Sequence, residues 1–174
     1  MGLQLIFVVE TNKKCKSDWI YIKETIDHFY QYSNTQVKLT PVYMDGKGKY
    51  KSKEKEISSL ISQYASTSKT NQSKVIFCFD CDDYDVKPED DTFLKNAQQY
   101  CAAARYDFVW FCKDIEHVYI GERVADRQKK TESVRFISKK LINSVSESQL
   151  TANRYQVKKS NIMTVLDQHL TRKD

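Results

Sequence analysis

Four short apolar segments, separated by amphipathic helical patterns, constrain the fold of this chain more than any other feature. They cover residues 3–9, 37–44, 74–79 and 106–112. The first and third are continuously apolar, which is typical of strands buried on both faces. Pro41 favours an edge position for the second, or an interruption of the strand. Strands that alternate with helices build a parallel sheet covered by helices on both faces. The order predicts an α/β fold with a mostly parallel four-stranded sheet.

The rest of the chain is expected to be helical and to belong to the same domain. A chain of 174 residues is long enough for one core and too short for two comfortable domains. We therefore expect a single domain over 1–174, with a core at 1–120 and a C-terminal helical extension at 121–174. Two apolar stripes at helical spacing are expected in the extension: Val134, Ile137, Leu141 and Val145, and then Ile162, Val165, Leu166, His169 and Leu170.

The start of the chain and its cysteines predict a cytoplasmic protein. The apolar segment 3–9 has no basic leader and is too short to span a bilayer. The five cysteines are an odd number, which in a chain with a large core favours reduced thiols. Cys78 and Cys81 have zinc-knuckle spacing, but no second pair follows them. We expect no membrane partner and no zinc site.

Acidic side chains follow two of the apolar segments. Glu10 comes directly after the first, and Asp80 and Asp82 end the third. Ligands of open parallel sheets bind at the carboxyl ends of the strands, and residues two apart in a strand face one side. Clustered carboxylates without His or Cys suit Mg²⁺ or Mn²⁺. The alternative is ordinary turn and capping chemistry, for which Asp is common after strands. We favour a metal site.

Basic residues predict a nucleic-acid partner. The net charge is +5, and lysines alternate through one polar stretch. A basic surface beside an acidic centre suits a metal site that acts on a polyanion, although each lysine alone is more simply explained as solvated. Tyr50 and Tyr84 are the candidates for base stacking, and His117 is the only histidine near the expected site. The candidate nucleic-acid-binding residues are Lys47, Lys49, Lys51, Lys53 and Lys55.

The order of elements and the acidic residues resemble the Toprim domain. That family has a Glu at the end of its first strand and a DxD at the end of its third, here Glu10 and Asp80–Asp82. Within it the chain is most similar to the small RloB-like and OLD-type branch. Local similarities are Glu10-Thr11 followed by 18–21, the segment 107–116 and the closing 159–166. The family often has Gly where this chain has Thr11 and Asp83.

The resemblance implies a Mg²⁺-dependent nuclease of a prokaryotic defence or mobile-element system. Asp80 and Asp82 would bind the metal, and Glu10 would act as a general acid–base group or a further ligand. Glu116, with Asp114, would complete a second metal position. Such metals polarise the phosphate and lower the pKa of the attacking water. The resemblance also implies a separate ATPase partner as one option, since Toprim nucleases in such systems often have one. The chain itself has no Walker A motif, so we expect no ATP hydrolysis by that route.

Two other functions are compatible with the sequence. The first is a non-catalytic, Toprim-like module that binds metal or nucleic acid and regulates a partner protein, which the missing glycines favour. The second is a phosphatase or receiver-like domain, because residues 77–82 resemble the motif of the haloacid dehalogenases, whose DxD also follows an apolar strand. In that family the motif is on the first strand, whereas here it is on the third and Asp83-Tyr84 follows it. We rank this second reading last.

Overall fold

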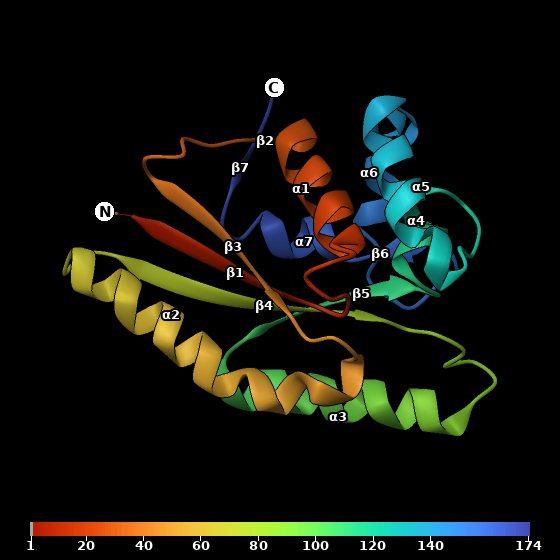
Figure 1. Cartoon of the computed structure of the whole chain (residues 1–174), viewed down its shortest axis with the longest axis horizontal. Helices are drawn as coiled ribbons and strands as arrows, with labels where there is room; N and C mark the ends of the chain where they lie inside the picture. Colours follow the sequence, from red (N-terminus) through yellow and green to blue (C-terminus); the bar gives the residue numbers. More distant parts are fainter. Residues whose placement is uncertain (1) are drawn as a thin grey trace.

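A computed structural model describes residues 2–174 and contains a central, mostly parallel sheet (Figure 1). The order of its five strands is β3-β1-β4-β5-β6. Strands β3, β1, β4 and β5 are parallel, and β6 pairs antiparallel with β5. The strands are β1 (Leu3–Val9), β3 (Val37–Tyr43), β4 (Gln72–Asp80), β5 (Asp107–Cys112) and β6 (Lys159–Ser160).

The α/β class and the mostly parallel sheet are confirmed, and the number of strands is wrong by one. The four expected strands are present within a few residues of their predicted limits, and β3, which carries Pro41, lies at the edge as expected. The fifth strand, β6, has only two residues. A segment of that length has no alternation of polar and apolar residues to detect, because its pairing depends on the neighbouring β5.

Helices cover both faces of the sheet (Figure 1). On one face lie α2 and α3, and on the other lie α1 and the short helices of the C-terminal part. Among residues 2–174 no helix is long and apolar enough to cross a bilayer. The helices are α1 (Ser17–Phe29), α2 (Glu54–Thr67), α3 (Pro88–Ala104), α4 (Ile115–Tyr119), α5 (Asp126–Ser138), α6 (Glu147–Leu150) and α7 (Ile162–Leu166), with 3-10 helices η1 (Lys47–Lys53) and η2 (Leu141–Ser144).

Strand alternation divides the buried residues into two clusters. In β1, Leu5 and Phe7 pack against α1 and the C-terminal helices, whereas Ile6 and Val8 pack toward α2 and α3. The one polar side chain of β1, Gln4, is buried and bonds both neighbouring strands. It donates to Thr40 Oγ1 (3.1 Å) and accepts from Ser73 Oγ (2.9 Å). The buried amide is satisfied on both sides, and these bonds help to hold the register of the three strands.

The C-terminal part is less helical than expected and one of its predicted stripes is wrong. Helix α5 ends at Ser138, and Val134 and Ile137 are 54% and 42% exposed. The side chains of α5 that are buried are Ser133 and Phe136. Besides β6, this part contributes β7 (Thr171–Arg172), which pairs antiparallel with β2 (Tyr30–Gln31). Its buried residues join the same cluster as α1.

The strand order creates one point at which the loops after two adjacent strands lead to opposite faces of the sheet. After β1 the chain enters α1 on one face, whereas after the adjacent β4 it enters α3 on the other face (Figure 1). Ligands of open α/β sheets bind in the crevice at such a point, outside the carboxyl ends of the strands. A site is therefore expected among the residues that follow β1 and β4.

Candidate functional site

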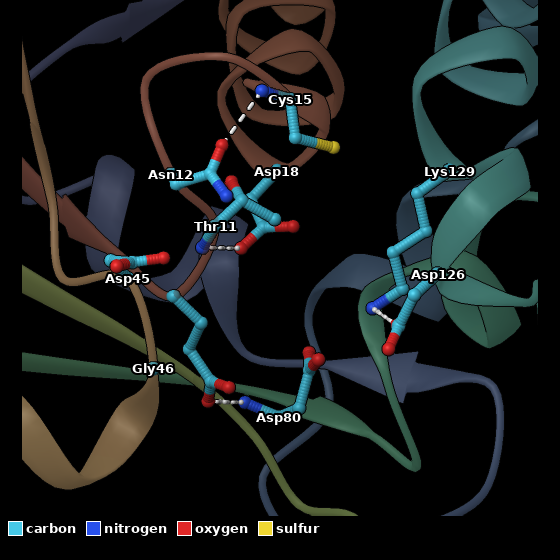
Figure 2. A pocket seen from close by; sticks show the side chains of 10 residues that line it. Thr11, Asn12, Cys15, Asp18, Asp45, Gly46, Asp80, Asp126 and Lys129 are labelled. Carbon is cyan, nitrogen blue, oxygen red and sulfur yellow. Dashed lines mark hydrogen bonds and ion pairs between the residues drawn. The ribbon is translucent and has the colours of Figure 1, made fainter.

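A pocket of about 420 Å³ lies at this point (Figure 2). Of the five acidic side chains that line it, three are buried or half-buried: Glu10 after β1, Asp18 in the first turn of α1 and Asp80 at the end of β4. Lys129 of α5 faces them. The remaining lining residues are Thr11, Asn12, Cys15, Asp45, Gly46 and Asp126.

Asp80 is held in place by two hydrogen bonds, one at its backbone N–H and one at its carboxylate. Its own N–H donates to Glu10 Oε1 (2.8 Å), and its Oδ1 accepts from the N–H of Ile115 (2.9 Å). In β4 the side chains of Ile76 and Cys78 face α1, so by alternation Asp80 faces the same side. The sequence expectation that Glu10 and Asp80 lie together at one edge of the sheet is met in this structure.

Asp18 is the site residue that the sequence analysis did not assign. It is buried, and its Oδ2 accepts from the N–H of Thr11 (3.1 Å). This bond joins α1 to the loop after Glu10. A signal was present in the sequence, because Asp18 precedes Ile22 by four residues and Ile26 by eight, which places a carboxylate on the buried stripe of the helix. An acidic residue on a buried stripe needs a partner or a ligand.

The pKa values of these carboxyl groups are raised. Burial raises the pKa of Glu10 to about 8; a hydrogen bond from Asp80 opposes the rise, and the charges of Asp18 and Asp82 add to it. Burial also raises the pKa of Asp80, with contributions from Glu10 and Asp18, and burial raises that of Asp18. The repulsion among these groups is only partly compensated, which is the electrostatic condition under which a bound cation stabilises a site.

Among the described residues, Lys129 is the one cation that lines the pocket with these carboxylates. Its Nζ lies 3.8 Å from Glu116 Oε2 and 3.6 Å from Asp126 Oδ1, and its side chain is mostly buried. Burial lowers the pKa of Lys129, but Glu116, Asp80 and Asp18 raise it by more, so the ammonium stays charged. Helix α5 thus brings a positive charge from the C-terminal part of the chain to the pocket.

Glu116 is placed differently from its predicted role. Its side chain is 0% exposed and does not line the pocket. Neither carboxylate oxygen has a hydrogen-bond partner among residues 2–174, and burial raises the pKa of the group to about 7. Glu116 therefore acts on the site through its ion pair with Lys129 and through its charge, which raises the pKa of Asp80. Direct catalysis by Glu116 stays a prediction that this geometry does not favour.

Asp114 and His117 hold each other at the start of α4. Asp114 Oδ1 accepts from the N–H of His117 (2.8 Å) and lies 3.0 Å from His117 Nδ1. Arg123 Nε donates to Asp114 Oδ2 (3.3 Å). Both oxygens of Asp114 are occupied by protein partners, which identifies this carboxylate as a helix cap. The suggested second metal position at Asp114 and contact of His117 with a ligand remain untested.

Asp82 does not line the pocket with Asp80, contrary to the expectation that the two share a face. Strand β4 ends at Asp80, and Asp82 has a φ of 50°. The rule that residues two apart face the same side holds only within extended chain, so it fails here. The carboxylate of Asp82 pairs with Lys47, and Asp82 does not line the pocket. Its role as a metal ligand stays a prediction.

The five candidate lysines do not form one continuous face. Residues 47–53 form the 3-10 helix η1, in which side chains point in several directions. Lys47 pairs with Asp82 and Asp90, and Lys49 pairs with Asp45 (3.3 Å). The remaining three are Lys51 above the ring of Tyr50, Lys53 beside Glu56, and Lys55, which is exposed on α2.

The two tyrosines proposed for base stacking are engaged within the protein. Tyr50 is 6% exposed and packs edge-on against Phe79, Phe93 and Tyr100, so its prediction as an exposed stacking residue is wrong. The turn of η1 directs Tyr50 into the core, whereas the sequence pattern placed it in a polar loop. Tyr84 packs edge-on against Tyr155 and is half-buried.

The residue types at the pocket fit a hard divalent cation, but their spacing is not that of a ligand set. Within residues 2–174 no group of three or more Asp, Glu, His or Cys side chains is arranged to hold a metal ion. All five cysteines are free thiols, four of them buried. No family model, no curated protein and no solved structure matches the chain. The Toprim resemblance and the metal site therefore stay predictions.

Proposed function

We propose that this chain is a Mg²⁺- or Mn²⁺-dependent nuclease whose centre is formed by Glu10, Asp18 and Asp80. One observation supports this above the others. Carboxylates from three separate elements line one pocket at the point where the loops after β1 and β4 separate, and their pKa values are raised there. Such perturbed groups in a crevice favour a functional site over ordinary capping. The Toprim resemblance supplies the substrate class.

The chain's own residues divide the work in the proposed reaction. Asp80, held by the N–H of Ile115, and Asp18, held by the N–H of Thr11, present oxygens to a cation. Glu10, with a pKa of about 8, exchanges a proton near neutral pH, as a general acid–base group must. Lys129 offers positive charge to a phosphate on the α5 side of the pocket. A bound divalent cation would polarise the phosphate and acidify the attacking water.

The test is cleavage of labelled single-stranded DNA, single-stranded RNA and duplex DNA by the chain alone. We expect cleavage with Mg²⁺ or Mn²⁺ and none in EDTA. Asp80→Asn should reduce the rate by about 100-fold or more, the usual scale for a positioned charged group. Asp91→Asn, in the first turn of α3 outside the pocket, is the matched control and should keep the rate within about twofold. Metal-independent cleavage, or full activity of Asp80→Asn, would refute the proposal.

A non-catalytic binding module is the second candidate. It is favoured by the absence of a ready ligand set within residues 2–174 and by Lys129, which already places a positive charge among the carboxylates. If this candidate is correct, the chain binds nucleic acid without cleaving it, with or without metal. A separate ATPase partner stays a prediction for either candidate, and adding one is the next arm if the chain alone is inactive.

A further inference from the structure

A second cavity opens beside the carboxylate pocket and has the opposite charge. It has a volume of about 440 Å³ and shares Asn12 and Asp45 with the first pocket. Its other lining residues are Lys13, Lys14, Lys53 and Tyr43. Three lysines thus surround an open cavity that directly adjoins the acidic centre. We call it the basic cavity.

The lysines of the basic cavity come from two elements and differ in their freedom. Lys13 and Lys14 belong to the loop between β1 and α1, are exposed, and make no ion pair with any of residues 2–174. Asn12 Oδ1 shapes this loop by accepting from the N–H groups of Lys14 (3.0 Å) and Cys15 (2.9 Å). Lys53, at the end of η1, lies 3.4 Å from Glu56 Oε2, so its charge is partly shared.

The other lysines near the site are already used. Lys47 is bound by Asp82 and Asp90, and Lys49 pairs with Asp45. An anion gains least from a lysine whose charge is neutralised by a carboxylate. Lys129 lies on the α5 side of the pocket (Figure 2), so the cations available on the side of Asn12 and Asp45 are Lys13 and Lys14, with Lys53 as the third. Two of these three lie outside the stretch 47–55 that the sequence singled out.

We propose that the basic cavity binds consecutive backbone phosphates, about one for each of its three lysines, of the nucleic-acid strand whose neighbouring phosphodiester enters the carboxylate pocket. This inference rests on the proposed function and identifies where the protein contacts its substrate. A polyanion meets repulsion at a pocket lined by Glu10, Asp18 and Asp80, so its approach requires positive charge close by. The basic cavity supplies that charge within one continuous surface, because the two cavities share Asn12 and Asp45.

The experiment measures binding without cleavage. A fluorescein-labelled single-stranded DNA 20-mer is titrated in EDTA at 50 to 200 mM NaCl, and the slope of log affinity against log salt is determined by anisotropy. Each lost phosphate contact reduces a single-strand slope by about 0.7. The triple variant Lys13→Gln, Lys14→Gln, Lys53→Gln should therefore have a slope smaller by about 2. Over this fourfold range of salt, the wild-type affinity should fall by about 15-fold more than that of the variant.

A matched control removes the same charge elsewhere. Lys38, Lys69 and Lys74 are exposed and lie near the amino ends of β3 and β4, at the edge of the sheet opposite the site. Their triple change to Gln should leave the slope within about 0.5 of the wild-type value. Equal slopes in the two triple variants, an unchanged slope in the first, or a wild type that does not bind the 20-mer would overturn the inference. Binding that depends on Lys13, Lys14 and Lys53 without metal-dependent cleavage would sustain it while favouring the binding-module candidate over the nuclease.

Discussion

Replacing Lys129 with Met should destabilise the protein in a strongly pH-dependent way. Lys129 is the only cation within ion-pair distance of the buried Glu116 among the residues described, at 3.8 Å from Oε2. Met has a similar length and no charge, so the substitution removes the ammonium while it keeps much of the packing. Below its pKa of about 7, Glu116 carries a proton and loses little when the ammonium is removed. Above it, the carboxylate would be left buried and unpaired.

The size of the effect follows from the distance and from the pKa. At an effective dielectric constant of about 20, two charges 3.8 Å apart attract by about 4 kcal/mol. Losing this attraction would cost more than keeping Glu116 protonated at pH 8.5, so in Lys129→Met the Glu116 carboxyl group should retain its proton. The folded-state pKa of Glu116 is raised, so its contribution to stability is present below pH 4.5 and is lost as the pH rises. In the wild type that loss levels off above about 7, whereas in the variant it continues.

The expected extra loss in the variant is about 1.4 kcal/mol for each pH unit above 7, or about 2 kcal/mol at pH 8.5. Urea unfolding in EDTA at pH 5.5 and pH 8.5 measures it. Lys130→Met, on the same helix at an exposed position, is the control and should show no pH-dependent difference. In Glu116→Gln the effect of Lys129→Met should lose part of its pH dependence, and the remainder should come from Asp18, whose pKa Lys129 lowers. A stability difference between wild type and Lys129→Met that is the same at both pH values would refute this reasoning.

Three further predictions concern the carboxylate pocket. Urea unfolding of the wild type in EDTA should show a loss of stability between pH 5 and pH 8. Folded Glu10 and Glu116, with pKa values near 8 and 7, keep protons that the unfolded chain releases above about 4.5. A flat profile would contradict this. Asp80→Asn in EDTA at pH 8 should unfold at no lower urea concentration than the wild type, because repulsion is relieved and Asn Oδ1 can still accept from Ile115; severe unfolding would make Asp80 a structural cap. Mg²⁺ at a hundredfold excess over its dissociation constant should stabilise the wild type by about 2.7 kcal/mol and should not stabilise Asp80→Asn. Identical melting curves of the wild type in millimolar Mg²⁺ and in EDTA would argue against a site.

The sheet was largely predictable because its strands are long and buried. Continuous apolar runs such as 3–9 and 74–79 carry their own signal, and Pro41 indicated the edge. Strands β2, β6 and β7 have two residues each and depend on partners that are distant in sequence. The stripe expected through Val134 and Ile137 was wrong because α5 buries Ser133 and Phe136 instead.

The site was predictable only where a strand determined it. Glu10 and Asp80 follow buried strands, and their meeting follows from the parallel order of β1 and β4. Asp82 lies two residues beyond Asp80, where a positive φ turns the chain, and no alternation rule applies there. Asp18 and Lys129 come from α1 and α5, whose placement over the pocket depends on the packing of all the helices on that face of the sheet. Helical spacing places Asp18 on the buried stripe of α1, but it does not show where that helix packs on the sheet.

The central claim, that Glu10, Asp18 and Asp80 form a divalent-cation site, is tested most directly by Mn²⁺ binding. Electron paramagnetic resonance of free Mn²⁺, titrated with the protein at pH 7.5, counts bound ions without reference to any substrate. We expect saturable binding to the wild type, loss of at least about 1.4 kcal/mol of binding free energy, or tenfold in affinity, in Asp80→Asn and in Asp18→Asn, and wild-type binding in the Asp91→Asn control. Free Mn²⁺ that stays unbound by the wild type at millimolar concentration, or binding that both pocket variants retain unchanged, would contradict the claim.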